Sequence, residues 1–174
     1  MTRQTLVVCT ALFAAAMLQA QTDNLFSTEL KGSYTNVKNN LMKAAAKMSE
    51  ADYAFKATPE VRPFGQLIGH VADSNLRVCS TVNGEAKQGS ASSKTAKADL
   101  VNALQDSFAE CDKAFEALTD ANAAQTISAG RSQRSKLSSL WGVVTHDNEM
   151  YGTISVYLRL KGLVPPSTEG RAAR

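Results

Sequence analysis

The chain has 174 residues, of which 20% are charged, and its formal net charge at pH 7 is +3. A charge this small argues against a protein that binds nucleic acid or an acidic membrane through a large basic field. The length suits one ordinary domain that can bury a core without added cross-links. One local basic cluster, Arg131, Arg134 and Lys136, has no aromatic residues interleaved with it, so we interpret it as a solvated face.

The first 20 residues have the pattern of a secretory signal peptide. A short basic start containing Arg3 precedes an apolar run from Thr5 to Ala20, and the chain then turns polar. The run is shorter than the roughly 20 apolar residues that span a membrane comfortably, and an uncleaved anchor is the alternative. We expect cleavage after Ala20, or after Ala16, and export to the periplasm or secretion. Cleavage after Ala20 leaves 154 of the 174 residues and a charge of +2.

Two helices are expected in the first half of the remaining chain. The first is about 35 Å long and carries one apolar stripe, which consists of Phe26, Leu30, Tyr34, Val37, Leu41, Ala44 and Met48. Pro59 and Pro63 interrupt the pattern, so residues 51–62 are expected to form a connection. The second helix begins near Pro63 and ends near Asn83. Its stripe consists of Phe64, Leu67, Ile68, Val71, Asn75, Val78, Cys79 and Val82.

Two further helices are expected after a polar loop at residues 84–95. The third carries Leu100, Val101, Leu104, Phe108, Cys111, Phe115 and Leu118. After a polar link, the fourth runs from about Ser135 to Leu160 and carries Leu137, Leu140, Trp141, Val144, Tyr151 and Leu158. Gly162 fits a C-terminal cap, and residues 167–174 are expected to form a loose tail. No segment alternates as a strand would, so the pattern predicts an all-α four-helix bundle over residues 21–166.

The chain has only two histidines, His70 and His146, and they fall on the second and fourth expected helices. Each alone is more often a structural histidine than a metal ligand. Bundle cores can nevertheless build metal sites from side chains on facing helices, so the pair raises a metal-site hypothesis. Their positions along the sequence do not by themselves bring them together.

Two segments resemble the signatures of the DinB/YfiT-like superfamily. They are FGQLIGHVADSNLRVCS at residues 64–80 and HDNEMYGTISVYLRLKGLVPPS at residues 146–167. The first expected helix and the stretch SEADYAFKATPEVR also match, so the resemblance covers nearly all of the mature chain. It implies a bundle with up-down-down-up order, often dimeric, in which three histidines hold a divalent metal, typically zinc or nickel. One histidine lies on the second helix, and two lie four residues apart on the fourth.

Carried onto this sequence, the first two ligand positions are His70 and His146, and the third holds Met150. A thioether is a soft, neutral donor, so it suits copper(I) better than zinc or nickel. Met150 can equally be an ordinary core residue beside a degenerate site. Asp73, one turn after His70, is a candidate for an added ligand or for a hydrogen-bond acceptor behind a ligand. Asp147 is expected to point away from the ligand positions, because each residue turns a helix by about 100°.

Cys79 and Cys111 are the two cysteines that remain after cleavage, which removes Cys9. Each lies on an apolar stripe, about 17 residues into its helix, so the two reach the same height if the second and third helices run parallel. The link between these helices is long enough to run back along the bundle. An oxidising compartment then permits a disulfide, and two buried free thiols are the alternative.

Three classes of function remain open. The first is an exported DinB-like bundle with a weak or degenerate divalent-metal site, which holds no metal in the extreme case, and no assigned activity. The second is a metal-dependent transferase or hydrolase that uses His70 and His146. The third is a binding module whose cavity between helices takes a small molecule. Neither nucleic acid nor, after cleavage, a membrane is an expected partner, whereas a homodimer is compatible with the resemblance.

Overall fold

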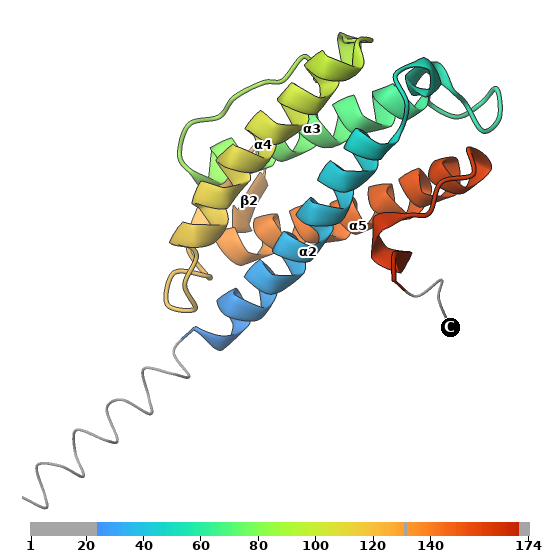
Figure 1. Cartoon of the computed structure of the whole chain (residues 1–174). Helices are drawn as coiled ribbons and strands as arrows, with labels where there is room; N and C mark the ends of the chain where they lie inside the picture. The colour runs from blue at the N-terminus through green and yellow to red at the C-terminus, as the bar shows by residue number, and fades with distance from the viewer. Residues whose placement is uncertain (1–23, 131, 171–174) are drawn as a thin grey trace, which may run out of the picture.

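The computed structural model describes residues 24–130 and 132–170, which fold into a four-helix bundle (Figure 1). The helices are α2 (Leu25–Lys47), α3 (Phe64–Val82), α4 (Lys97–Ala117) and α5 (Lys136–Leu160). Three short 3-10 helices are η1 (Ala51–Ala54), η2 (Ala91–Ser93) and η3 (Pro166–Thr168). The all-α bundle predicted from the sequence is confirmed. The expected signal peptide, residues 1–20, lies outside the described residues. Within the described ranges, no helix has the length and apolar character to cross a membrane.

Helices α3 and α4 lie side by side and run parallel (Figure 1). At their starts, a Cβ on Gly65 of α3 would lie 3.1 Å from the Leu100 side chain of α4. Near their ends, Cys79 of α3 is joined by a disulfide to Cys111 of α4, with the two Cα atoms 4.9 Å apart. The equal depth of the two cysteines in their helices thus reflects the parallel order.

Helices α2 and α5 run antiparallel to this pair. The start of α2 lies at the end of α4, where the Asp120 carboxylate accepts hydrogen bonds from the Phe26 and Ser27 N–H groups at 3.1 and 2.7 Å. The end of α5 reaches the start of α3, where the Tyr157 hydroxyl donates to the Arg62 carbonyl at 2.7 Å. The order of the bundle is therefore up-down-down-up.

The link between α3 and α4 returns along α3 and is fastened to it. The Asp73 carboxylate on α3 accepts hydrogen bonds from the Ala91 and Ser92 N–H groups at 2.8 and 2.9 Å, where η2 begins. Gly69 allows the close approach, because a Cβ there would come within 2.8 Å of the Ala91 carbonyl oxygen. A parallel helix pair needs such a return segment, since short loops join antiparallel neighbours.

Most of the expected stripe residues are buried in the core or, like Val78, Val101 and Leu137, partly buried against it, but two are exposed. Phe26 is 68% exposed and Trp141 is 59% exposed. Phe26 lies in the first turn of α2, where the neighbouring Ser27 is buried instead. Trp141 lies about 100° around α5 from the buried Leu140, outside the face that contacts the other helices. The prediction that both residues are buried, which rested on their apolar character, is therefore wrong.

The link between α4 and α5 contains a β-hairpin that the sequence did not predict. Strand β1 (Thr126–Ala129) pairs antiparallel with β2 (Ser132–Ser135). Gly130 in the turn has a φ of +66°, which glycine adopts without steric cost. The strands escaped prediction because each has only four residues. Strand β1 alternates polar and apolar residues over too short a span to be distinctive, and all four residues of β2 are polar.

Helix α5 ends as expected, and the chain beyond it contacts the bundle. Gly162 has a φ of +73°, as a C-terminal cap requires. At the start of the expected tail, the Ser167 hydroxyl is hydrogen-bonded to the Tyr151 hydroxyl at 3.0 Å, and Glu169 pairs with Lys47. Residues 171–174, the end of that tail, lie outside the described residues.

We expect replacement of both Cys79 and Cys111 by alanine to lower the free energy of unfolding by about 3 to 4 kcal/mol. The disulfide joins residues 32 positions apart and so restricts the unfolded chain. Urea unfolding of the wild type and of the double variant, both starting at Gln21, measures the difference. Thiol titration of the denatured, unreduced wild type should find no reactive thiol, and two thiols per chain would contradict the disulfide.

Candidate functional site

His70 on α3 and His146 on α5 face each other between the two helices. Their Nε2 atoms are 3.1 Å apart, and their ring planes meet at 70°. Both side chains are partly buried. In the absence of an ion between them, one ring donates an N–H at this distance and the other accepts it. The fold thus brings together two of the ligand positions that were identified from the sequence.

Asp147 lies behind His146 and is completely buried. Its Oδ2 accepts a hydrogen bond from the Asn75 side-chain amide at 2.9 Å. Its Oδ1 has no hydrogen-bond partner in the described part of the chain and lies 3.6 Å from His146 Nδ1. Burial raises the pKa of the Asp147 carboxyl, and the contacts with His146 and Asn75 oppose the rise. A small shift would let His146 Nδ1 donate to Oδ1, which would leave Nε2 able to accept a hydrogen bond or bind a metal.

Asp147 was not expected at the site, because it lies about 100° around α5 from His146. That rotation turns Asp147 into the core rather than towards solvent. Its neighbours on the same helical face, Val143, Val144 and Tyr151, are buried as well. An acidic residue in the middle of an apolar helical face is the sequence signal that would have indicated a buried carboxylate.

The electrostatic environment of His70 favours its neutral imidazole. Burial lowers the pKa of His70, and the positive charges of His146, Arg62 and Arg77 lower it further, whereas Asp73 opposes them. A neutral imidazole is the form that can bind a metal or accept a hydrogen bond. His70 therefore keeps a usable lone pair at neutral pH when the proton lies on its other nitrogen.

The two remaining sequence-predicted positions lie in different surroundings. Met150, one turn further along α5, is partly buried and packs against the hydrophobic core. Asp73, one turn after the α3 histidine, accepts hydrogen bonds from Ala91 and Ser92 through both of its carboxylate oxygens. Its observed contacts therefore hold the α3–α4 link in place.

The two imidazoles can supply two ligands to a divalent cation, which is fewer than a stable site needs. Zinc lies about 2.0–2.1 Å from imidazole nitrogens, so two nitrogens at the observed spacing of 3.1 Å are close enough to bind one ion together. Within residues 24–130 and 132–170, no group of three His, Cys, Asp or Glu side chains could hold a metal. His70 and His146 would hold the ion, with water or the Met150 sulfur in the remaining positions.

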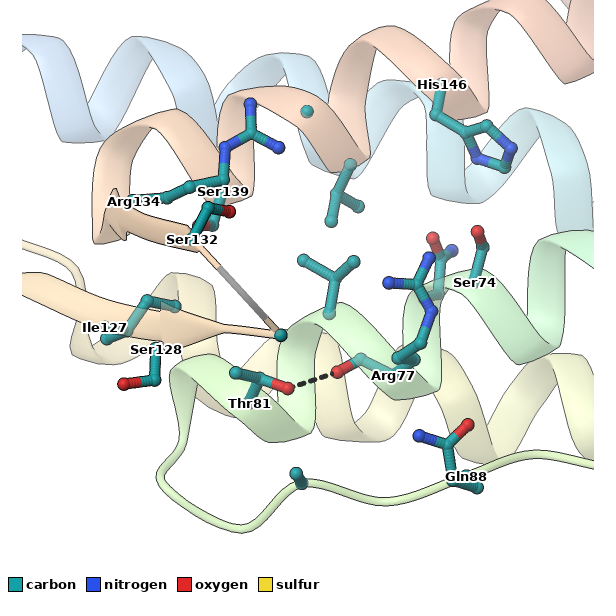
Figure 2. Close-up of a pocket in the computed structure, with 16 residues that line it drawn as sticks. Ser74, Arg77, Thr81, Gln88, Ile127, Ser128, Ser132, Arg134, Ser139 and His146 are labelled. Atoms are coloured by element: carbon teal, nitrogen blue, oxygen red, sulfur yellow. Dashed lines mark hydrogen bonds between the residues drawn. The ribbon is translucent and has the colours of Figure 1, made fainter.

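A pocket of about 550 Å³ opens beside His146, between α3, α5 and the hairpin (Figure 2). Arg77 lines it from α3 and Arg134 lines it from β2. The basic cluster that includes Arg134 was interpreted as a solvated face, and Arg134 is indeed exposed, but it also borders this pocket. Arg131 lies outside the described residues. The pocket could not be predicted from the sequence, because its lining residues come from α3, the α3–α4 link, the hairpin and α5, which meet only in the fold.

Comparisons with known proteins agree with this architecture. A family model of the DinB superfamily matches residues 33–154, which is more than half of the chain. A DinB-like protein from Bacillus cereus ATCC 10987 is 16% identical with a TM-score of 0.65, and the match covers 79% of this chain and 93% of that one. A DinB-like protein from Bacillus subtilis is 20% identical with a TM-score of 0.62, covering 77% and 92%.

A conserved protein from Enterococcus faecalis is 12% identical with a TM-score of 0.62, and the match covers 77% of this chain and 95% of that one. No curated protein matches the sequence. At these identities, the solved structures show a likeness of fold alone.

Replacement of Asp147 by asparagine should stabilise the fold at neutral pH by about 1 kcal/mol. Asparagine keeps an acceptor for Asn75 and removes a buried charge whose carboxyl pKa is raised by burial. A carboxyl with a raised pKa binds protons more readily in the folded state. The contribution of Asp147 to stability is therefore most favourable below its ordinary pKa of 3.8 and is lost as the pH rises through the folded-state value.

The stabilisation by Asp147→Asn should accordingly shrink as the pH falls. Urea unfolding at about pH 7.5 and about pH 4.5 measures both values. Asp73→Asn is the matched control, and it should destabilise the protein at neutral pH because the Asp73 carboxylate accepts hydrogen bonds through both oxygens. If Asp147→Asn destabilised the protein as much as Asp73→Asn at neutral pH, the Asp147 charge would be a net stabilising partner of His146.

Proposed function

The chain belongs to the DinB superfamily, and on that premise we propose that it is an exported DinB-like bundle with a weak or degenerate divalent-metal site and no assigned activity. The observation that supports the proposal is the pair of facing imidazole nitrogens, His70 Nε2 and His146 Nε2, 3.1 Å apart. The chain has no other histidine, and the resemblance assigns the third ligand position to Met150. Stable zinc sites have at least three protein ligands, so two nitrogens and water would hold the ion weakly.

We expect Met150→His to increase the affinity for zinc or nickel by about tenfold or more, because a third nitrogen completes a set of three protein ligands. The position lies one helical turn after His146, where two imidazoles can bind one ion from the same helical face. Calorimetric titration of metal-free protein with zinc and with nickel measures the change. Met150→Leu, which has a similar volume and no sulfur, is the matched control.

His70→Ala in the Met150→His background should remove the gain. If the wild type already bound zinc or nickel as tightly as Met150→His does, the metal site would not be weak. If the site has instead adapted to a soft ion, the wild type should bind copper(I) and lose it on Met150→Leu. If Met150→His gained no affinity for any of these ions, positions 70, 146 and 150 would not converge on one site.

A metal-dependent transferase or hydrolase is the second candidate. It is favoured by the position of His146, which both faces His70 and lines the pocket. When bound, a divalent ion supplies a Lewis acid that polarises an oxygen of a substrate. Metal analysis of protein purified from its native compartment separates the two candidates, since about one zinc or nickel ion per chain would favour the enzyme.

A small-ligand binding module is the third candidate, and the pocket beside His146 supports it. The volume of about 550 Å³ falls within the range of roughly 300–1,000 Å³ that is usual for ligand sites. A ligand could bind there with or without a metal ion at the histidines. This candidate therefore does not depend on Met150.

Export is part of the proposal and rests on the basic start and apolar run at residues 1–20. The disulfide between Cys79 and Cys111 agrees with an oxidising compartment. N-terminal sequencing of the native protein should begin at or near Gln21. An intact Met1 on soluble cytoplasmic material would overturn the proposal.

A further inference from the structure

We propose that the pocket beside His146 binds a small organic anion, whose carboxylate or phosphate group is held by Arg77 and Arg134. The inference rests on the small-ligand function described above and names the chemistry of the ligand. It requires no metal ion at the histidines.

The two arginines lack negative partners among residues 24–130 and 132–170. Neither Arg77 nor Arg134 forms an ion pair in the described part of the chain, and the Arg134 guanidinium makes one long hydrogen bond, 3.4 Å, to the Ser138 hydroxyl. Elsewhere in the bundle, Lys38 and Lys161 each lie 2.6 Å from a carboxylate oxygen. Two guanidinium groups without counter-ions give the pocket a positive potential that attracts an anion.

The rest of the lining is neutral and supplies hydrogen-bond donors. No Asp or Glu occurs among the sixteen described residues that line the pocket. Ser74 and Gln88 contribute a hydroxyl and an amide group, whereas the Thr81 hydroxyl already donates to the Arg77 carbonyl at 2.7 Å (Figure 2). An anion bound here would therefore meet donors and positive charge, whereas a cationic ligand would meet repulsion without a compensating carboxylate.

The pocket also has apolar walls for the body of a ligand. Val78 of α3, Ile127 of β1 and Val143 of α5 line it on three sides. Its volume of about 550 Å³ exceeds what a bare inorganic anion needs. A carboxylate or phosphate monoester attached to an apolar group the size of a ring matches both the charge and the walls, since the planar guanidinium fork pairs with either anion.

Three probes of similar size test the inference, namely benzoate, phenyl phosphate and the neutral isostere benzamide. Calorimetric or NMR titration of the purified protein, in buffer freed of metal by a chelating resin, gives their dissociation constants. We expect at least one of the two anions to bind about tenfold or more tightly than benzamide. The stronger of the two anions distinguishes a carboxylate ligand from a phosphate ester.

Arg77→Gln and Arg134→Gln remove the charge and keep an amide that can donate hydrogen bonds. Each should weaken binding of the preferred anion by about tenfold and leave benzamide binding unchanged. Arg159→Gln is the matched control, because Arg159 is an exposed arginine of α5 that does not line this pocket. Thermal unfolding of the variants checks that the fold is intact, as expected for exposed positions.

Equal binding of benzamide and the anions would overturn the anion inference and leave the small-ligand function standing. Absence of binding by all three probes would count against both. Arg159 lines a smaller pocket at the end of α5, so an equal loss of anion affinity in Arg159→Gln would show that overall charge or that smaller pocket, and not the pocket beside His146, accounts for anion binding. Retention of anion binding in both Arg77→Gln and Arg134→Gln would also overturn the inference.

Discussion

The parallel packing of α3 on α4 determines where the residues of the site lie. It requires a link that returns along α3, and Asp73 holds that link through the backbone of η2. Because α4 then ends beside the end of α3, the hairpin that follows it contacts the second half of α3, and α5 runs back along α3 towards its start. This route places His146 opposite His70 and puts Arg134 and Arg77 around one pocket. An antiparallel α3–α4 pair would have separated these residues.

The interior of the bundle contains a chain of polar groups that crosses between α3 and α5. It runs from Asn75 to Asp147, continues to His146 and ends at His70. Such groups cost stability in an otherwise apolar core unless each finds a partner, and Asp147 Oδ1 has none in the described part of the chain. A scaffold needs no such chain, because apolar residues of the same volume would pack more favourably. We therefore interpret these residues as part of a site rather than of the scaffold.

The helices could be predicted from the sequence, because apolar periodicity is a local property. Their up-down-down-up order was implied only by the family resemblance, and the equal depth of the two cysteines permitted a disulfide but left two free thiols as the alternative. Phe26 and Trp141 could not be placed, since periodicity identifies a face but not how far the neighbouring helices extend over it. The hairpin was too short and too polar to leave a pattern. Asp147 was excluded as a metal ligand from its angle to His146 alone, and that angle does not show whether the side chain is exposed or buried in the core. The pocket depends on the meeting of α3, α5 and β2, which no single segment of sequence records.

A metal ion at the histidines and an anion in the pocket would influence each other electrostatically. Burial and nearby positive charges lower the pKa of His70. A divalent cation at the two imidazoles would meet the opposition of burial, Arg62 and Arg77, but not of His146, which is neutral when it binds a metal. An anion bound by Arg77 would offset part of it. Opposite unit charges about 10 Å apart attract by roughly 1.7 kcal/mol at an effective dielectric constant of about 20. By thermodynamic linkage, the metal would strengthen anion binding to the same degree. If no anion is bound, weak metal binding at the histidines would then result from the positive lining of the neighbouring pocket as well as from the thioether of Met150.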